Sequence, residues 1–256
     1  MTEVSATKNR LRSLLDNSKS AILDFDGLVA DSEPFHFRAY NEVFERYGHT
    51  LNKEEYWVEW TSKGKGIAGE IKRHDLKLNV DTVELRQQKF EVYSQFCQSG
   101  DIKLFPLAQS MAESLSAHHK LAIASGSWIK DIRNILKNAD SLNLFPIILG
   151  KESAPREKPH PDIFLKAAEK LGCAASECFV VEDALKGLNA AKEAGMPCII
   201  LRNPLNRNIN FYGAELIFEI GKKIKEDFDY KNMPLMMAMI DAILENKKLD
   251  IKWENF

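Results

Sequence analysis

Short apolar runs alternate along most of the chain with longer segments whose apolar residues recur at helical spacing. The runs lie at residues 21–25, 121–124, 147–149, 179–181 and 198–201, with a weaker candidate at 216–218. Near-continuous apolarity of this length is typical of strands that helices cover on both faces. Helical patterns follow three of the runs, at residues 129–136, 161–171 and 184–194. This alternation predicts an α/β fold with a doubly wound parallel sheet.

The interval between the first two runs departs from this rhythm. It contains helical patterns at residues 34–47, 53–60 and 83–97 and a glycine-rich stretch at 63–69. A crossover between two parallel strands needs far less chain. We therefore expect an inserted all-helical cap domain over residues 34–99, with residues 1–33 and 100–256 forming one discontinuous α/β core domain.

Charge and hydropathy exclude several classes of partner. The 35 basic and 37 acidic residues give a net charge of −2, so we expect no nucleic-acid partner. The N-terminus lacks the apolar core of a signal peptide, and the longest apolar stretch, residues 233–244, is too short to cross a bilayer. We expect a cytoplasmic protein without a membrane partner. The helix expected at 234–244 either pads the core or forms a dimer contact, so the chain is expected to be a monomer or a weak homodimer.

Two acidic pairs follow apolar runs. Asp24 and Asp26 end the first run, and Glu182 and Asp183 directly follow the run at 179–181. Neighbouring carboxylates at a strand end repel one another unless a cation or a proton relieves them, and Mg²⁺ would suit them. The alternatives are an ordinary Asp-Gly turn for the first pair and a helix cap for the second.

A hydroxyl and a lysine follow two further strands. Ser125 and Gly126 come after the second run and can present an O–H and a backbone N–H to an anion. A helix cap at Ser127 is the simpler interpretation of that segment. Lys158, next to Pro159, can act as a fixed point charge for a phosphate, although a lone lysine is usually only a surface residue. Together with the acidic pairs, these residues are hard to explain by turns and caps alone.

The order DFDGLVADS, ASGS, KPHPDIF and VVEDALKGLNAAKEAG resembles the four signature motifs of the haloacid dehalogenase-like superfamily. The branch it resembles is that of β-phosphoglucomutase and the sugar-phosphate phosphatases, whose cap is helical, and the resemblance covers roughly residues 20–205. It implies that Asp24 is the nucleophile that forms an aspartyl-phosphate. It also implies that Asp26 is the acid/base that protonates the leaving oxygen and then activates water.

The same resemblance implies the remaining roles at the site. Mg²⁺ would be held by Asp24, the backbone carbonyl of Asp26 and Asp183, with Glu182 nearby. Ser125, Gly126 and Lys158 would bind the phosphoryl group, which makes a small phosphorylated molecule the expected partner.

The cap residues separate the members of this branch. The resemblance to the start of the mutase cap makes His36 the candidate that couples cap closure to the acid/base, although similar histidines occur in phosphatases of this branch and a surface histidine is the alternative. The basic stretch around Lys65 could reach an anionic substrate, or could be a solvated loop. Trp57 and Trp60 share a helical face and are expected to pack in the core. Gly69 and Gln95 stand where the mutase carries an arginine and a lysine that bind a second phosphate. Lys63, Lys65 and Lys72 could substitute for them, but the mutase pattern is not matched.

We therefore expect a Mg²⁺-dependent phosphatase that acts on a small phosphorylated metabolite, a sugar phosphate in particular. The alternatives are a β-phosphoglucomutase-type mutase and a non-catalytic binding or regulatory protein on the same fold. Asp26 argues against dehalogenase and phosphonate-cleaving chemistry, because those relatives lack an aspartate at this position.

Overall fold

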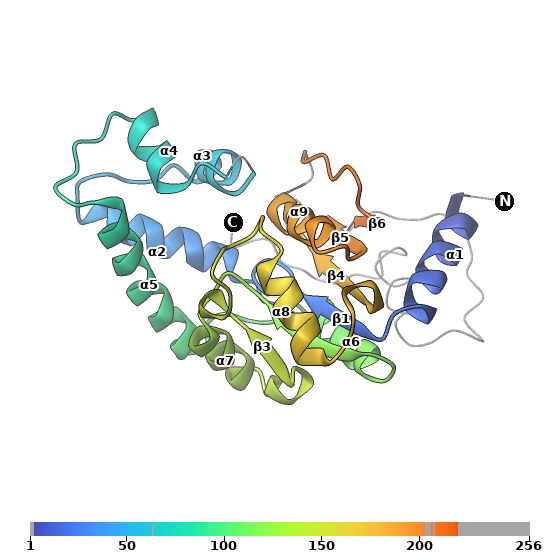
Figure 1. Cartoon of the computed structure of the whole chain (residues 1–256). Coiled ribbons are helices and arrows are strands. Elements are labelled where there is room, and N and C mark those ends of the chain that lie inside the picture. Colours follow the sequence, from blue (N-terminus) through green and yellow to red (C-terminus); the bar gives the residue numbers. More distant parts are fainter. Residues whose placement is uncertain (1–2, 63, 203–205, 207, 220–256) are drawn as a thin grey trace.

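A six-stranded parallel sheet forms the centre of the protein (Figure 1). The computed structural model describes residues 3–62, 64–202, 206 and 208–219. The strand order is β3-β2-β1-β4-β5-β6, the order of a doubly wound fold. The strands are β1 Ser20–Leu23, β2 Lys120–Ala124, β3 Ile147–Leu149, β4 Cys178–Glu182, β5 Cys198–Arg202 and β6 Leu216–Glu219. All six predicted strands are thus confirmed, including the weak candidate.

Alternate residues of each strand enter two separate cores because successive side chains point to opposite faces. In β1, Ala21 and Leu23 pack into one cluster and Ile22 into the other. Helices α1, α6 and α7 contribute to the first cluster, and α8 and α9 contribute to the second. Their bounds are α1 Glu3–Asp16, α6 Pro106–Ser116, α7 Ile129–Asn138, α8 Asp162–Leu171 and α9 Leu185–Glu193. Short 3₁₀ turns lie at Leu142–Leu144, Lys151–Ser153 and Ala175–Glu177.

The part of the chain from residue 33 to residue 99, between β1 and β2, forms the helical cap, which extends to one side of the sheet (Figure 1). None of the described residues from 33 to 99 is in a strand. The cap elements are α2 Glu33–Glu45, α3 Lys53–Glu55, a π-helix at Tyr56–Ser62, α4 Gly66–Arg73 and α5 Thr82–Ser99. The expected helix at 53–60 therefore changes to π geometry at Tyr56. Trp60 is buried there against Tyr40 and Tyr56, in agreement with the packing role expected of it.

Helix α5 connects the cap to the core. Asp81 caps its start by accepting hydrogen bonds from the backbone N–H groups of Val83 and Glu84, both at 2.8 Å. Gly100 ends it in the left-handed conformation, with φ of 81°. Helix α5 packs against α2 of the cap and also against α7 of the core, so its contacts do not mark a domain boundary. The division at residues 34–99 therefore remains our proposal.

Two expectations concern other parts of the chain. The helix expected at 234–244 lies outside the described residues. Within the part of the chain that the structure describes, no helix has the length and apolar character needed to span a membrane.

Candidate active site

The carboxyl ends of β1 and β4 lie side by side at the centre of the sheet. Successive crossovers run from β1 to one edge of the sheet and from β4 to the other, so the chain reverses direction between these two strands. Ligands of open α/β sheets bind at such a reversal, outside the carboxyl ends of the strands. Asp24 directly follows β1 and Glu182 is the last residue of β4. The topology therefore brings together two carboxylates that are far apart in the sequence.

Lys158 joins these two carboxylates. Its Nζ donates hydrogen bonds to Asp24 Oδ1 and Glu182 Oε1, both at 2.7 Å, and to the backbone carbonyl of Ala124 at 2.9 Å. Its side chain is only 6% exposed, so it is held in one position rather than solvated at the surface. The lysine is therefore placed to meet an anion that reaches Asp24.

Burial and like charges shift the pKa values of the carboxylates. Burial, together with the charge of Glu182, raises the pKa of Asp24 to about 7 against the opposing effect of Lys158. Burial and the charges of Glu182 and Asp24 also raise the pKa of Asp183 well above its usual range. Burial alone would lower the pKa of Lys158, but the two carboxylates raise it above its ordinary value. The cluster thus holds more negative charge than a single lysine neutralises.

Asp24, Glu182 and Asp183 form a possible metal-binding group. Each offers a carboxylate oxygen, and these oxygens lie within 4.8 Å of one another. Glu182 Oε2 also accepts hydrogen bonds from the backbone N–H groups of Asp183 and Ala184, both at 3.0 Å. Gly27, with φ of +77°, lies so close to Asp183 that a Cβ would be 2.7 Å from its Oδ2. A group of oxygen donors with excess negative charge fits a hard divalent cation.

The carboxylate of Asp26 lies outside this metal-binding group and accepts five hydrogen bonds of 2.7–3.2 Å. The donors to Oδ1 are Ser32, His36 and Tyr93, and those to Oδ2 are Ser125 and Ser127. Burial alone would raise the pKa of Asp26, but the hydrogen bonds from His36, Ser127 and Ser32 hold it well below its usual range. In this arrangement Asp26 is ionised and is placed to accept a proton.

His36 contacts Asp26 from the cap, with Nε2 at 3.1 Å from Oδ1. Its ring stacks on Tyr93 with centroids 4.0 Å apart, and its Nδ1 lies 2.7 Å from Lys89 Nζ. Because a lysine ammonium can only donate, Nδ1 is the acceptor and the proton sits on Nε2. Lys89 thereby fixes the tautomer in which His36 donates to Asp26.

Sequence reasoning missed Lys89 and Tyr93. Both are buried on α5, on the same face as Leu85 and Val92. A lysine at helical spacing among apolar positions was the available signal, because a cation on a core-facing stripe needs a specific partner. Ser127, expected as a helix cap, instead donates to Asp26 at 2.7 Å, and Trp128 occupies the capping position of α7.

Other candidate residues lie apart from the carboxylates or take no visible part in the network. Lys65 is exposed where α4 begins, and Gln95 is exposed on α5. Gly126 is exposed beside Ser125, with open space in front of its Cα. Gly69 lies within α4 and contributes no side chain.

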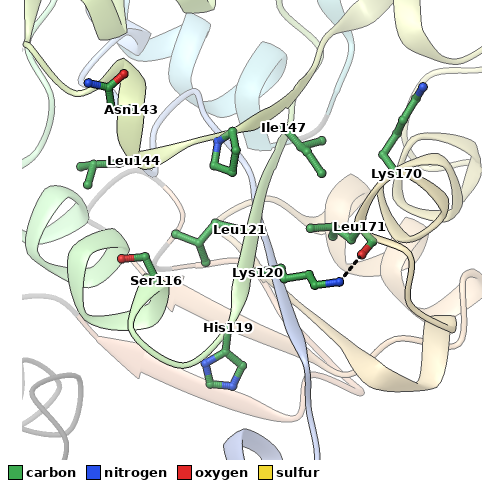
Figure 2. Close-up of a pocket in the computed structure, with 10 residues that line it drawn as sticks. Ser116, His119, Lys120, Leu121, Asn143, Leu144, Ile147, Lys170 and Leu171 are labelled. Carbon is green, nitrogen blue, oxygen red and sulfur yellow. Dashed lines mark hydrogen bonds between the residues drawn. The ribbon is translucent and has the colours of Figure 1, made fainter.

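A pocket of about 440 Å³ lies away from these residues, where β2 and β3 begin (Figure 2). Its lining includes Lys120, Ile147 and Lys170, and Lys120 donates to the carbonyl of Leu171 at 2.9 Å. Because it lies at the amino ends of the strands, it is separate from the Asp24 and Lys158 cluster.

Comparisons with known proteins point to one family. The profile described as haloacid dehalogenase-like hydrolase matches residues 21–201. The fructose-1-phosphate phosphatase YqaB of Escherichia coli is 29% identical over 185 residues, which cover 71% of this chain and 95% of YqaB. Protein CbbY of Cereibacter sphaeroides is 28% identical over 210 residues, which cover 78% of this chain and 91% of CbbY.

A solved structure agrees with these sequence relatives. CbbY from Rhodobacter sphaeroides in complex with phosphate superposes with a TM-score of 0.67 at 26% identity, covering 78% of this chain and 93% of that one. A variant of the same protein was solved in complex with xylulose-(1,5)bisphosphate.

Proposed function

Because the chain belongs to the haloacid dehalogenase-like hydrolase family, we propose that it hydrolyses phosphate esters of small metabolites, sugar phosphates in particular, at Asp24. One observation carries this proposal: Lys158 bridges Asp24 and Glu182 at the carboxyl ends of β1 and β4. The names of two relatives and neighbours, a fructose-1-phosphate phosphatase and a bisphosphate-bound CbbY, favour a phosphorylated sugar as the substrate.

The reaction has two steps in this proposal. Asp24 attacks phosphorus, the bond to the sugar oxygen breaks, and Asp26 gives a proton to that leaving oxygen. Asp26 then takes a proton from water, which attacks phosphorus and breaks the bond to Asp24 to release phosphate. Lys158 binds the phosphoryl oxygens while charge develops on them, and Ser125 joins it when its hydroxyl turns from Asp26 to the phosphoryl group.

The hydrogen bonds to Asp26 suit the second step of this reaction. With His36 in contact, Asp26 is ionised and can accept the proton of water. The first step requires protonated Asp26, and loss of the His36 hydrogen bond would raise the pKa of Asp26 toward that form. His36 therefore links the cap to the protonation state of Asp26 in this proposal.

Mg²⁺ is the cation proposed for Asp24, Asp183 and the backbone carbonyl of Asp26. Glu182 is placed mainly to hold Lys158 and the backbone of Asp183 and Ala184. The ion, when bound, neutralises charge on the transferring phosphoryl group.

Hydrolysis is favoured over phosphate transfer between sugar positions. A mutase must keep the sugar bisphosphate bound while this intermediate reorients in the site, which requires side chains that bind its second phosphate. Gly69 supplies no side chain, Gln95 is neutral and exposed, and Lys89 is engaged with His36. Phosphorus NMR of β-glucose 1-phosphate with a trace of the bisphosphate separates the two activities, and glucose 6-phosphate without free phosphate would establish the mutase instead.

The test of the mechanism is Asp24→Asn. We expect the folded variant to release no phosphate from a panel of sugar phosphates with Mg²⁺, because the amide is a poor nucleophile. Asp75→Asn, at an exposed aspartate of the cap, is the matched control and should keep full activity. Undiminished turnover by Asp24→Asn would contradict the proposal, and a wild-type chain inactive on every ester would favour the binding-protein alternative.

A further inference from the structure

The cap contains a second group of potential metal ligands, formed by His49, Glu70 and His74. Their ligand atoms lie within 4.8 Å of one another. Glu70 lies on α4, and His74, four residues later, is the residue that caps the end of this helix, so their side chains lie on the same side of it. His49 follows α2. Glu70 Oε1 lies 2.8 Å from His49 Nε2 and 3.4 Å from His74 Nε2. Helix α4 is well separated from the sheet in Figure 1, so this group is distinct from the Asp24 cluster.

The second carboxylate oxygen of Glu70, Oε2, accepts hydrogen bonds that hold the side chain in position. Trp60 Nε1 donates to Glu70 Oε2 at 2.9 Å, and Arg73 also hydrogen-bonds Oε2. Glu70 is only 1% exposed, so these bonds fix the direction in which Oε1 points. Outer donors that orient a carboxylate toward neighbouring imidazoles are typical of metal-ligand sites.

The charges around Glu70 do not balance. Arg73 lies 3.3 Å from Glu55 and 3.9 Å from Glu59 and also pairs with Glu70. Glu55 and Glu70 thus share one guanidinium, which leaves one negative charge when the imidazoles are neutral. An uncompensated charge costs free energy where Glu70 is buried. A bound cation would offset this charge.

The donor atoms determine the class of cation. Mg²⁺ and Ca²⁺ prefer oxygen ligands, whereas two imidazole nitrogens and a carboxylate suit Zn²⁺ and similar transition metals. Metal–ligand bonds of about 2.0–2.1 Å place tetrahedral ligands about 3.3 Å apart. The 2.8 and 3.4 Å separations at Glu70 Oε1 bracket that spacing.

We propose that His49, Glu70 and His74 bind a transition-metal ion of the Zn²⁺ class. Glu55 Oε2 lies 2.9 Å from His74 Nε2 at the exposed side but outside this group of ligand atoms, so water would supply the fourth ligand. The ion would join α4 to the segment after α2, and so would stabilise the cap. This site is independent of the function proposed for Asp24.

Cobalt binding to the full-length chain tests the proposal. Metal-stripped protein is titrated with Co²⁺ in the presence of excess Mg²⁺, which occupies oxygen-ligand sites but does not compete for imidazoles. We expect one equivalent of Co²⁺ to bind with the visible bands of a tetrahedral site, and Zn²⁺ to displace it. His49→Gln and His74→Gln should each weaken binding at least about tenfold, whereas His118→Gln, at an exposed histidine of the core, should not.

A variant that gains a spectroscopic signal distinguishes loss of a metal ligand from misfolding. In His74→Cys a thiolate would replace the imidazole, so bound Co²⁺ should acquire a sulfur-to-cobalt charge-transfer band. Circular dichroism and phosphate release report on the fold of each variant. The proposal is overturned if the wild type binds no Co²⁺ under excess Mg²⁺. It is equally overturned if both glutamine variants bind as the wild type does, or if His74→Cys shows no sulfur band.

Discussion

Glu182 can take its position because a glycine on α9 leaves room for its carboxylate. Gly187 lies within α9, and a Cβ at this position would be 1.8 Å from Glu182 Oε1. That oxygen accepts the 2.7 Å hydrogen bond from Lys158, which also contacts Asp24. The absence of one methyl group on α9 therefore leaves room for the Glu182 carboxylate that helps to position Lys158 in the proposed active site.

Gly187→Ala should impair catalysis more than folding. The added methyl group displaces the Glu182 carboxylate and with it Lys158, and a misplacement of about 1 Å can lower the rate on the order of a hundredfold. Steady-state kinetics on a sugar phosphate measures the effect on kcat. Asn189→Ala, at an exposed position of the same helix, is the control. Equal kcat values for the two variants would show that Glu182 does not position Lys158.

Burial lowers the pKa of Lys89 to about 8, and the attraction of Asp26 and Glu33 opposes this shift. Between pH 8 and the ordinary value of 10.5, the unfolded chain binds a proton at Lys89 that the native protein lacks. Stability therefore rises with pH in this window. Lys89→Met has no such group and should lack this rise.

The measurement is the free energy of unfolding by urea of wild type and Lys89→Met, below pH 8 and near pH 10. The free energy of unfolding of the wild type, relative to that of Lys89→Met, should increase with pH by up to about 3 kcal/mol, since each unit of pKa shift corresponds to about 1.36 kcal/mol. A difference that stays constant across the window would mean that the pKa of Lys89 is unshifted. Other titrating groups cancel because both proteins contain them.

Individual residues of the site were predictable to unequal degrees. Asp24, Glu182 and Lys158 follow apolar runs, so the sheet topology alone brings them to one edge. The partners of Asp26 on α5 were not predictable in the same way, because Lys89 and Tyr93 meet His36 through helix packing that no local pattern specifies. The geometry around Asp26 required the tertiary structure.

At the scale of elements, α5 is the helix that packs against both cap and core. Ser94 on α5 donates to both carboxylate oxygens of Asp131 on α7, at 2.8 and 2.9 Å. Asp131 is only 1% exposed, and burial raises its pKa in spite of the Ser94 hydroxyl. This buried contact fixes α5 against the sheet domain, while its other contacts hold α2 and His36.

Ser94→Ala should destabilise the protein by about 1–3 kcal/mol, because it leaves a buried carboxylate without its hydroxyl donor. Urea unfolding followed by circular dichroism measures the loss. Gln95→Ala changes the adjacent, exposed residue of α5 and should have an effect within about 0.5 kcal/mol. If the two variants were equally stable, the Ser94–Asp131 contact would contribute nothing to holding α5.

The elements show why hydrophobic pattern predicts some structures and not others. The strands were predictable because buried parallel strands are apolar on both faces. The π-helix at Tyr56–Ser62 was not, since its apolar spacing resembles that of an α-helix. Helix α6 was also absent from the predicted elements, although Ala108, Met111, Ala112 and Leu115 are buried at helical spacing.

For the whole molecule, a net charge of −2 conceals a concentration of carboxylates at one edge of the sheet. Without a metal, Asp24 has a pKa raised to about 7 by burial and by Glu182, and that of Asp183 is raised as well. The native protein then binds more protons than the unfolded chain between the ordinary carboxyl pKa of about 3.9 and about pH 7. Stability from these groups is present at low pH and is lost as pH rises through that window.

Mg²⁺ should therefore stabilise the protein more at about pH 8 than at about pH 5, because it competes with protons for the same carboxylates. The measurement is Tm with Mg²⁺ and with EDTA at both pH values. Asp183→Asn should lose most of the Mg²⁺-induced increase, whereas His74→Gln should keep it, since the cap ligands include imidazoles that Mg²⁺ disfavours. A Tm increase equal at both pH values, or one that survives Asp183→Asn, would place the Mg²⁺ site elsewhere than on this edge of the sheet.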